Sequence, residues 1–165
     1  MSNNAAHSSG WQIGEVVFGV PFLVAIALGF VVPVSCPGGL VRQACILVGA
    51  VLIVVGVAFI VAARRELARR GQPTDPGRPT TRLVTAGVFS FSRNPIYLGA
   101  GCFVGGIGLA ANLPWALVFL LLSLVACHQV LIAPEERYLL ARFGEQYTVY
   151  AATVNRWIGR ARMSR

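Results

Sequence analysis

The sequence predicts an all-α fold: a polytopic membrane bundle of about four transmembrane helices, arranged as two hairpins and followed by a C-terminal cytoplasmic amphipathic helix. Of its 165 residues 56% are hydrophobic and only 12% are charged, about half the charged share of a soluble domain. Mean hydropathy is +0.68. Four long apolar runs are flanked by arginines. The length suits one membrane domain and excludes a bundle joined to a separate soluble Rossmann domain.

This single domain, 1–165, divides into five consecutive parts. They are a polar tail (1–12), a first helical hairpin (13–63), a cytoplasmic loop (64–94), a second helical hairpin (95–133), and a cytoplasmic C-terminal helix with a basic tail (134–165). We expect no cleavable signal, because the first twelve residues lack a positive region and the apolar run after them is too long.

The first hairpin is predicted from two runs, Ile13–Val34 and Val41–Ala63. A span needs roughly 20 residues at 1.5 Å each to cross a ~30 Å hydrocarbon core, so both runs are long enough. The first run contains Pro21. Between them Ser35–Leu40, with its Cys-Pro-Gly-Gly sequence, predicts a tight turn.

The cytoplasmic loop begins as a helical extension over Arg64–Arg70. Gly71 is expected to end this helix, and the prolines and glycine of residues 73–79 prevent another from forming.

The second hairpin comprises a short, glycine-rich run, Pro95–Ala111, and a longer one, Pro114–Ala133. At about 17 residues the first is a marginal span. Asn112–Pro114 predicts the turn, since Asn favours a helix end and Pro a helix start. The two helices should be antiparallel neighbours, so that the start of one meets the end of the other at one membrane face.

Two glycine patterns occur in this third run. Gly106, Gly108 and Ala111 match the dinucleotide fingerprint GxGxxA, but no strand precedes them and no acid follows, so we discard that reading. Gly101 and Gly105 form a GxxxG pattern, for which close helix packing is the expected role. Near the helix start, Gly99 and Gly101 are also candidates for the close approach of a ligand.

The net charge of +8 comes from 14 arginines and six acids, without any lysine. Thirteen arginines lie in the inter-hairpin loop and the C-terminal segment, and only Arg42 lies on the opposite side. The positive-inside rule explains this distribution without nucleic acid and places both termini in the cytoplasm. We therefore expect an integral protein of a bacterial inner (plasma) membrane.

The C-terminal helix is predicted from Pro134 to about Ala152. Apolar side chains recur at three- and four-residue steps, which is typical of an amphipathic helix. They are Leu139, Leu140, Phe143, Tyr147 and Tyr150. The helix is expected to lie either against the cytoplasmic mouth of the bundle or on the lipid headgroups.

The four cysteines form no CxxC or Cys/His spacing, so we expect packing roles and no metal site.

A candidate site begins at Arg93-Asn94-Pro95. Pro95 suits the first helical turn, so the third helix presents unpaired N–H groups and a positive dipole end beside Arg93. Such an end accepts a carboxylate or phosphate. The plainer alternative is a helix N-cap with an arginine anchored at the membrane interface.

Glu135 and Glu136 leave the fourth run on the same membrane face as Arg93. Acids oppose the dipole at a helix C-terminus, which makes a purely structural role unfavourable. One glutamate is expected to pair with Arg93 or Arg137, and the other is left for a cationic group. His128 lies about two helical turns before Glu135 on nearly the same stripe. The cytosolic zwitterion S-adenosylmethionine fits such a site.

Several motifs in the C-terminal half resemble the membrane-embedded methyltransferases of the isoprenylcysteine carboxyl methyltransferase and phospholipid N-methyltransferase type. The resemblance covers Leu83 to Trp157. Its motifs are Leu83-Val-Thr85-Ala-Gly87-Val-Phe89, Arg93-Asn94-Pro95-Ile-Tyr97-Leu-Gly99, Pro134-Glu135-Glu136-Arg-Tyr-Leu139, Phe143-Gly144-Glu145-x-Tyr147 and Tyr150.

The resemblance implies a helical membrane enzyme that transfers a methyl group from S-adenosylmethionine to a lipid-like or hydrophobic acceptor. Its cofactor pocket would be formed by the last two membrane helices and the cytoplasmic segment after them. We assign catalytic roles to Arg93, Glu135 and Glu136. The candidate cofactor-binding residues are Asn94, Pro95, Tyr97, Gly99, Gly101, His128, Tyr138 and Tyr147.

Asn94 departs from the family pattern, since the eukaryotic prenylcysteine enzymes have His there. A neutral amide donates and accepts hydrogen bonds but cannot act as a base. The acceptor therefore stays open among a prenylcysteine carboxylate, a phospholipid amine, a small thiol and an isoprenoid.

A small non-enzymatic four-helix protein, such as an exporter subunit, is the alternative. Small exporters place an acid in their first helix, and Glu15 of this chain lies close to that position, though nearer the interface than mid-membrane. A haem subunit is disfavoured because no span carries paired histidines. The partners expected are membrane lipids and no nucleic acid, and the sequence does not indicate an oligomeric state.

Overall fold

Helices make up most of the chain. A computed structural model describes residues 10–73 and 80–160; the first nine residues of the predicted tail, loop residues 74–79 and the last five residues lie outside the described residues. The elements are α1 (Gly10–Val31), α2 (Leu40–Arg69), η1 (Gly87–Ser90), α3 (Pro95–Ala110), α4 (Pro114–Ala126), η2 (Cys127–Ile132), α5 (Ala133–Phe143) and α6 (Glu145–Thr153). No β-strand occurs in the described ranges, and the all-α class is confirmed.

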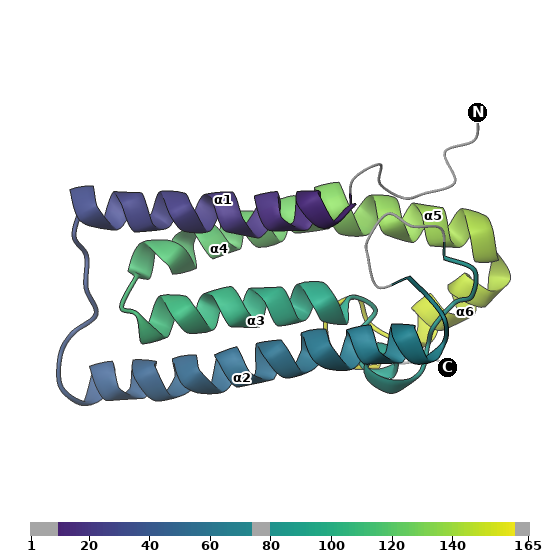
Figure 1. Cartoon of the computed structure of the whole chain (residues 1–165), viewed down its shortest axis with the longest axis horizontal. Coiled ribbons are helices and arrows are strands. Elements are labelled where there is room, and N and C mark those ends of the chain that lie inside the picture. The colour runs from purple at the N-terminus through teal and green to yellow at the C-terminus, as the bar shows by residue number, and fades with distance from the viewer. Residues whose placement is uncertain (1–9, 74–79, 161–165) are drawn as a thin grey trace.

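The long helices lie side by side in the order α1, α4, α3, α2 (Figure 1). Three of them are long and apolar enough to cross a membrane, over Gly14–Val31, Leu40–Arg69 and Pro114–Phe143. The shorter α3 has 16 residues, in line with its predicted marginal length. α1 packs against α4 and α2 against α3, so the first two helices do not form the tightly packed hairpin that was expected. Residues 32–39 instead cross one end of the bundle between its two outer helices.

Glycines explain why α2 lies on α3. A Cβ atom on Gly56 would lie 2.6 Å from the Gly99 carbonyl oxygen, and one on Gly49 would lie 2.6 Å from the Gly106 oxygen. These backbones touch because neither side carries a side chain. The predicted pair Gly101 and Gly105 faces α4 instead, so the close packing on α3 uses a different pair of glycines from the expected GxxxG.

One end of the bundle, the turn end, contains residues 32–39 and 111–113. There the Arg42 guanidinium donates to the carbonyl oxygens of Leu109 (3.0 Å) and Ala110 (2.8 Å). These are among the carbonyls that a helix leaves unpaired at its C-terminus. The Cys36 N–H donates to Asn112 Oδ1 at 2.8 Å and joins the two turns. The isolated arginine of this side therefore has a structural role, capping α3.

The opposite end, the polar end, contains residues 64–73, 80–94 and 133–160. The helix α4 runs without interruption through the π-helical η2 into α5. Pro134 lacks an N–H and cannot donate to the carbonyl of Val130, and a widened turn accommodates its ring. The fourth membrane helix thus continues to Phe143, ten residues beyond the predicted boundary at Ala133.

The predicted single C-terminal helix is wrong: it is two helices, α5 and α6, broken at Gly144. This glycine has φ +52°, a conformation that glycine adopts without steric penalty. Beyond the break, Tyr147, Tyr150 and Val154 are buried against Leu83 and neighbouring side chains. α6 therefore packs against the polar end of its own bundle. This is the first of the two expected arrangements, against the mouth of the bundle rather than on the lipid headgroups.

Candidate active site

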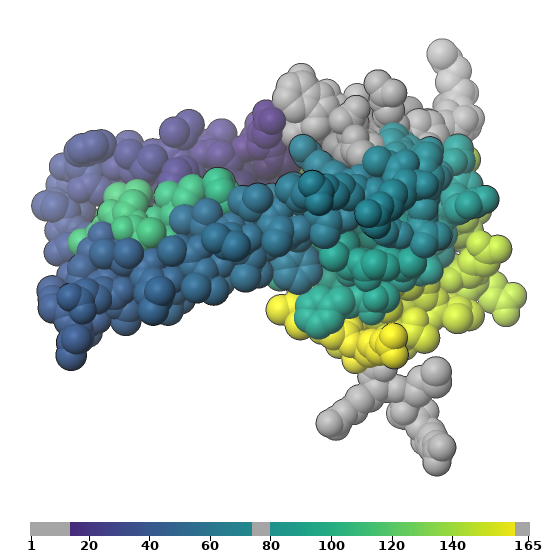
Figure 2. Space-filling view, turned by 60° about the horizontal axis from the view of Figure 1, so that its bottom comes forward, coloured from purple at the N-terminus to yellow at the C-terminus, as the bar shows by residue number. Residues whose placement is uncertain are grey.

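The start of α3 is held by the segment that follows α6. The backbone N–H of Arg93 donates to the backbone carbonyl oxygen of Asn155 at 3.2 Å, and Asn94 Nδ2 donates to the backbone carbonyl oxygen of Arg156 at 3.1 Å. Ser92 is fully buried between them. In Figure 2 the yellow C-terminal residues lie against the teal residues that precede α3. Segments about 60 residues apart in the chain thus build one wall.

Glu136 bridges two arginines at this wall. Its Oε1 lies 3.1 Å from Arg93 Nη1, and its Oε2 lies 2.6 Å from Arg156 Nη2. Arg156 Nε also donates to Glu136 Oε1 at 3.1 Å, so the Arg156 contact is bidentate. The carboxylate side chain is only 16% exposed, and shielding from water strengthens such contacts. One glutamate was expected to pair with Arg93 or Arg137, and the structure shows the pair with Arg93.

Tyr147 completes the surroundings of Arg93. Arg93 Nη1 donates to the Tyr147 hydroxyl oxygen at 3.2 Å. Burial, followed by the nearby Glu136 carboxylate, raises the pKa of Tyr147 to about 12. The phenol therefore stays protonated at neutral pH and keeps its own O–H to donate.

Glu135 has a different environment from its neighbour. The Tyr97 hydroxyl donates to Glu135 Oε2 at 3.3 Å, and this is the one hydrogen bond that the described residues give this carboxylate. An ionised carboxylate accepts about four hydrogen bonds. Glu135 is therefore the acid with capacity left for a cationic or hydroxyl-bearing ligand.

Two unsatisfied features point toward an anion. The Arg93 Nε is buried and has no hydrogen-bond partner among the described residues. The N-terminus of α3 has no side-chain cap, because the Asn94 amide is turned to Arg156. Asn94 is 6% exposed and Pro95 is fully buried, so the chain is shielded from water where it enters α3. A buried helix start without such partners is unusual in a stable fold.

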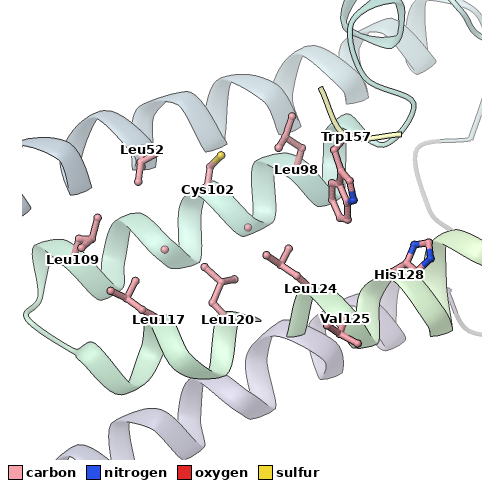
Figure 3. A pocket seen from close by; sticks show the side chains of 12 residues that line it. Leu52, Leu98, Cys102, Leu109, Leu117, Leu120, Leu124, Val125, His128 and Trp157 are labelled. Carbon is pink, nitrogen blue, oxygen red and sulfur yellow. The ribbon is translucent and has the colours of Figure 1, made fainter. Parts of the chain in front are cut away.

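An apolar groove of about 670 Å³ approaches the cluster along α3 and α4. Figure 3 shows His128 and Trp157 at the opposite end of the groove from Leu109 and Leu117, and Trp157 directly follows Arg156 in the chain. Gly101 lines the same groove. These two predicted site residues, His128 and Gly101, therefore face the groove.

The remaining predicted residues are spread around the cluster. Gly99 packs on α2, since a Cβ there would lie 2.7 Å from the Gly56 oxygen, so it is turned away from the charges. The Tyr138 hydroxyl accepts a hydrogen bond from the Thr80 N–H at 3.3 Å, between α5 and the loop.

Sequence reasoning missed Arg156 and Tyr150 as members of the site. Arg156 was counted with the basic tail that sets orientation, and its contact with Glu136 depends on the Gly144 break. The Tyr150 hydroxyl donates to the Phe89 oxygen at 2.7 Å and fixes the segment before α3. The resemblance included this tyrosine but gave it no role.

Fold and site together define an all-helical integral membrane protein with a buried cluster of arginine, glutamate and tyrosine at one end. A family model described as phospholipid methyltransferase matches residues 44–146, more than half of the chain. The chain belongs to the phospholipid methyltransferase family and is in general terms a membrane methyltransferase. No curated protein and no solved structure matches it.

Proposed function

We propose that this protein is an S-adenosylmethionine-dependent methyltransferase that methylates a lipid-like acceptor at the cytoplasmic leaflet. The observation that carries the proposal is the Arg93–Glu136 pair beside the less engaged Glu135, at the uncapped start of α3, in a chain of this family.

The residues present fit the cofactor by their chemistry. Its carboxylate suits Arg93, whose buried Nε has no partner among the described residues, and the uncapped amides of α3. Its amino group and ribose hydroxyls suit the free acceptor capacity of Glu135. Glu136 is already bound by two arginines, and its role is to hold them in place. Asn94 and Pro95 shape the helix start at which the ligand would bind.

Three tyrosines are proposed as walls of the pocket. Tyr97 and Tyr147 join the cluster through their hydroxyls, and Tyr138 closes the side toward the loop. Their rings exclude water, which strengthens the charged contacts within the site.

When bound, S-adenosylmethionine would supply an electrophilic methyl group on its sulfonium. The chain's own contribution is to bind, align and desolvate, since a well-oriented transfer needs little covalent help from the protein. Prenylcysteine carboxylate, phospholipid amine, small thiol and isoprenoid are all compatible acceptors. Asn94 offers an amide where the prenylcysteine enzymes have His, which favours acceptors that need no imidazole at this position.

Calorimetric titration with S-adenosylhomocysteine tests the cofactor site directly. We expect Glu135→Gln and Glu136→Gln to weaken binding about ten- to a hundredfold, because a hydrogen bond to a charged group contributes roughly 1.5–3 kcal/mol. Glu15→Gln, an acid of α1, is the matched control and should bind like the wild type. Unchanged affinity in folded forms of both site variants would overturn the assignment, and loss confined to Glu15→Gln would favour the exporter.

A further inference from the structure

The apolar groove between α3 and α4 is lined by residues other than those of the polar cluster. Its walls come from α3, through Leu98, Cys102 and Leu109, and from α4, through Leu117 and Leu120. With about 670 Å³ it lies within the ~300–1,000 Å³ range of small-molecule sites. The groove therefore has the size of a binding site and a lining of almost pure hydrocarbon.

Gly101 and Gly105 of α3 lie in the groove wall, where leucine side chains of α4 approach them. A Cβ on Gly101 would lie 3.4 Å from Leu124 Cδ2, and one on Gly105 would lie 3.0 Å from Leu120 Cδ2. Both contacts are with movable side-chain ends. At Gly99 and Gly106, by contrast, the added atom would meet the backbone of α2 within 2.8 Å. Backbone packing thus requires the glycines that face α2, whereas those that face α4 meet the ends of leucine side chains in the groove wall.

The groove has two distinct ends. Figure 3 shows Leu109 and Leu117 at the end near the turn, and Trp157 and His128 at the other. Trp157 directly follows Arg156, which binds Glu136. Between Leu98 and Leu109 α3 rises about 16 Å at 1.5 Å per residue, roughly half of a ~30 Å hydrocarbon core. The groove therefore follows α3 from near the turn end toward the polar end.

We propose that this groove holds one hydrocarbon chain of the acceptor lipid lengthwise, with the polar head passing Trp157 and His128 to reach the cluster. The assignment rests on the proposed function and deepens it. Leu109 and Leu117 close the far end and set the longest chain that fits. Trp157 and His128 contact the link between chain and head group.

A hydrocarbon chain is the occupant that the surroundings favour. The groove lies among the apolar helices of the bundle, and its lining includes Trp157, the residue that follows Arg156 of the polar cluster. Lipid tails are as apolar as leucine, so burial of the chain adds little driving force. What the groove contributes is alignment, because a chain held lengthwise fixes the position of its head group. Selection by chain length follows from that arrangement.

Photo-crosslinking tests the site without requiring methyl transfer. The probe is phosphatidylethanolamine with a diazirine at the end of one acyl chain, in vesicles containing the full-length protein. We expect the label on peptides that carry Leu109 and Leu117. Leu120→Trp, which fills the groove, should lower this labelling at least fivefold. Leu121→Trp, at the neighbouring position that is 66% exposed, should label like the wild type.

A second variant keeps the test decisive if Leu120→Trp does not fold. Leu117→Trp blocks only the far end, so it should lose the label from a long-chain probe and keep the label from a shorter one. Labelling spread over the outer faces of α1 and α2, equal in the wild type and the folded variants, would overturn the proposal. Groove labelling without methyl transfer contradicts the proposed function alone, and methyl transfer without groove labelling contradicts the groove alone.

Discussion

Arg93 has two candidate roles: it anchors the helix at the membrane interface, or it binds a carboxylate in the site. Its side chain is 14% exposed and binds Glu136 and Tyr147, which an arginine held at the membrane interface does not need. An anchoring arginine keeps its charge in water and can be replaced by any long cation. An arginine that binds a carboxylate needs its planar guanidinium group, which offers two parallel N–H donors.

Arg93→Lys should therefore insert and fold yet lose most methyl transfer, about ten- to a hundredfold, with Arg93→Ala worse still. Lysine keeps the charge but cannot supply two parallel N–H donors. Initial rates with radiolabelled S-adenosylmethionine measure the effect. Arg70→Lys is the control: Arg70 is more exposed and, among the described residues, forms an ion pair with Glu66 of the adjoining helix at 2.7 Å, so its rate should be unchanged. Wild-type rates for Arg93→Lys would contradict the binding role and leave Arg93 as an anchor at the membrane interface.

The pairing of Arg93 with a neighbouring glutamate could be predicted, because a three-residue turn forces α3 and α4 to be antiparallel. The choice of Glu136 over Glu135 could not, since it depends on side-chain directions after the widened turn at η2. Arg156 was beyond prediction for a related reason. It reaches Glu136 only because Gly144 turns the chain back, and a pattern of apolar spacing does not show that break.

Among the elements, α3 has two glycine faces with different purposes. Gly99 and Gly106 touch the backbone of α2, while Gly101 and Gly105 border the groove. The sequence spacing indicates a glycine-rich helix. Which of its glycines pack against α2 depends on the rotation of the helix about its own axis. The α1–α2 arrangement was hidden for the same reason, because a short loop suggested a hairpin and the glycine match placed α2 on α3.

Gly99→Ala should lower the melting temperature in detergent clearly, and Gly101→Ala should leave it near that of the wild type. The added methyl at position 99 would lie 2.7 Å from a carbonyl oxygen that cannot move freely. Such overpacking costs about 1–3 kcal/mol. The methyl at position 101 would meet a flexible leucine at 3.4 Å. Equal melting temperatures would show that α2 and α3 are not in backbone contact.

Across the whole molecule, the site residues gather at the end of the bundle that also carries most of the arginines. Arg42, the exception in the charge count, caps α3 at the turn end. The positive-inside rule predicts that the polar end faces the cytosol, where the methyl donor is found. Composition and apolar runs were enough to predict the membrane bundle, whereas the wall between the start of α3 and residues 155–159 depends on long-range backbone contacts.

Reporter fusions test this orientation. A phosphatase active only outside the cytoplasm should give signal when fused after residue 38 and none after residue 75, because the arginine-rich side is retained in the cytosol. A fluorescent protein that matures only in the cytosol should give the reverse pattern. Phosphatase activity at position 75 would contradict the predicted topology and move the site to the wrong compartment for the proposed cofactor.

The central claim is that the cluster at the start of α3 supports methyl transfer to a lipid. Its most direct test is to incubate the purified protein with radiolabelled S-adenosylmethionine and a membrane lipid extract, then separate the lipids and identify what carries the label. We predict a labelled lipid with the wild type and at least a tenfold weaker signal with Glu135→Gln. Absence of any labelled lipid from folded wild-type protein, or equal labelling by both proteins, would contradict the account.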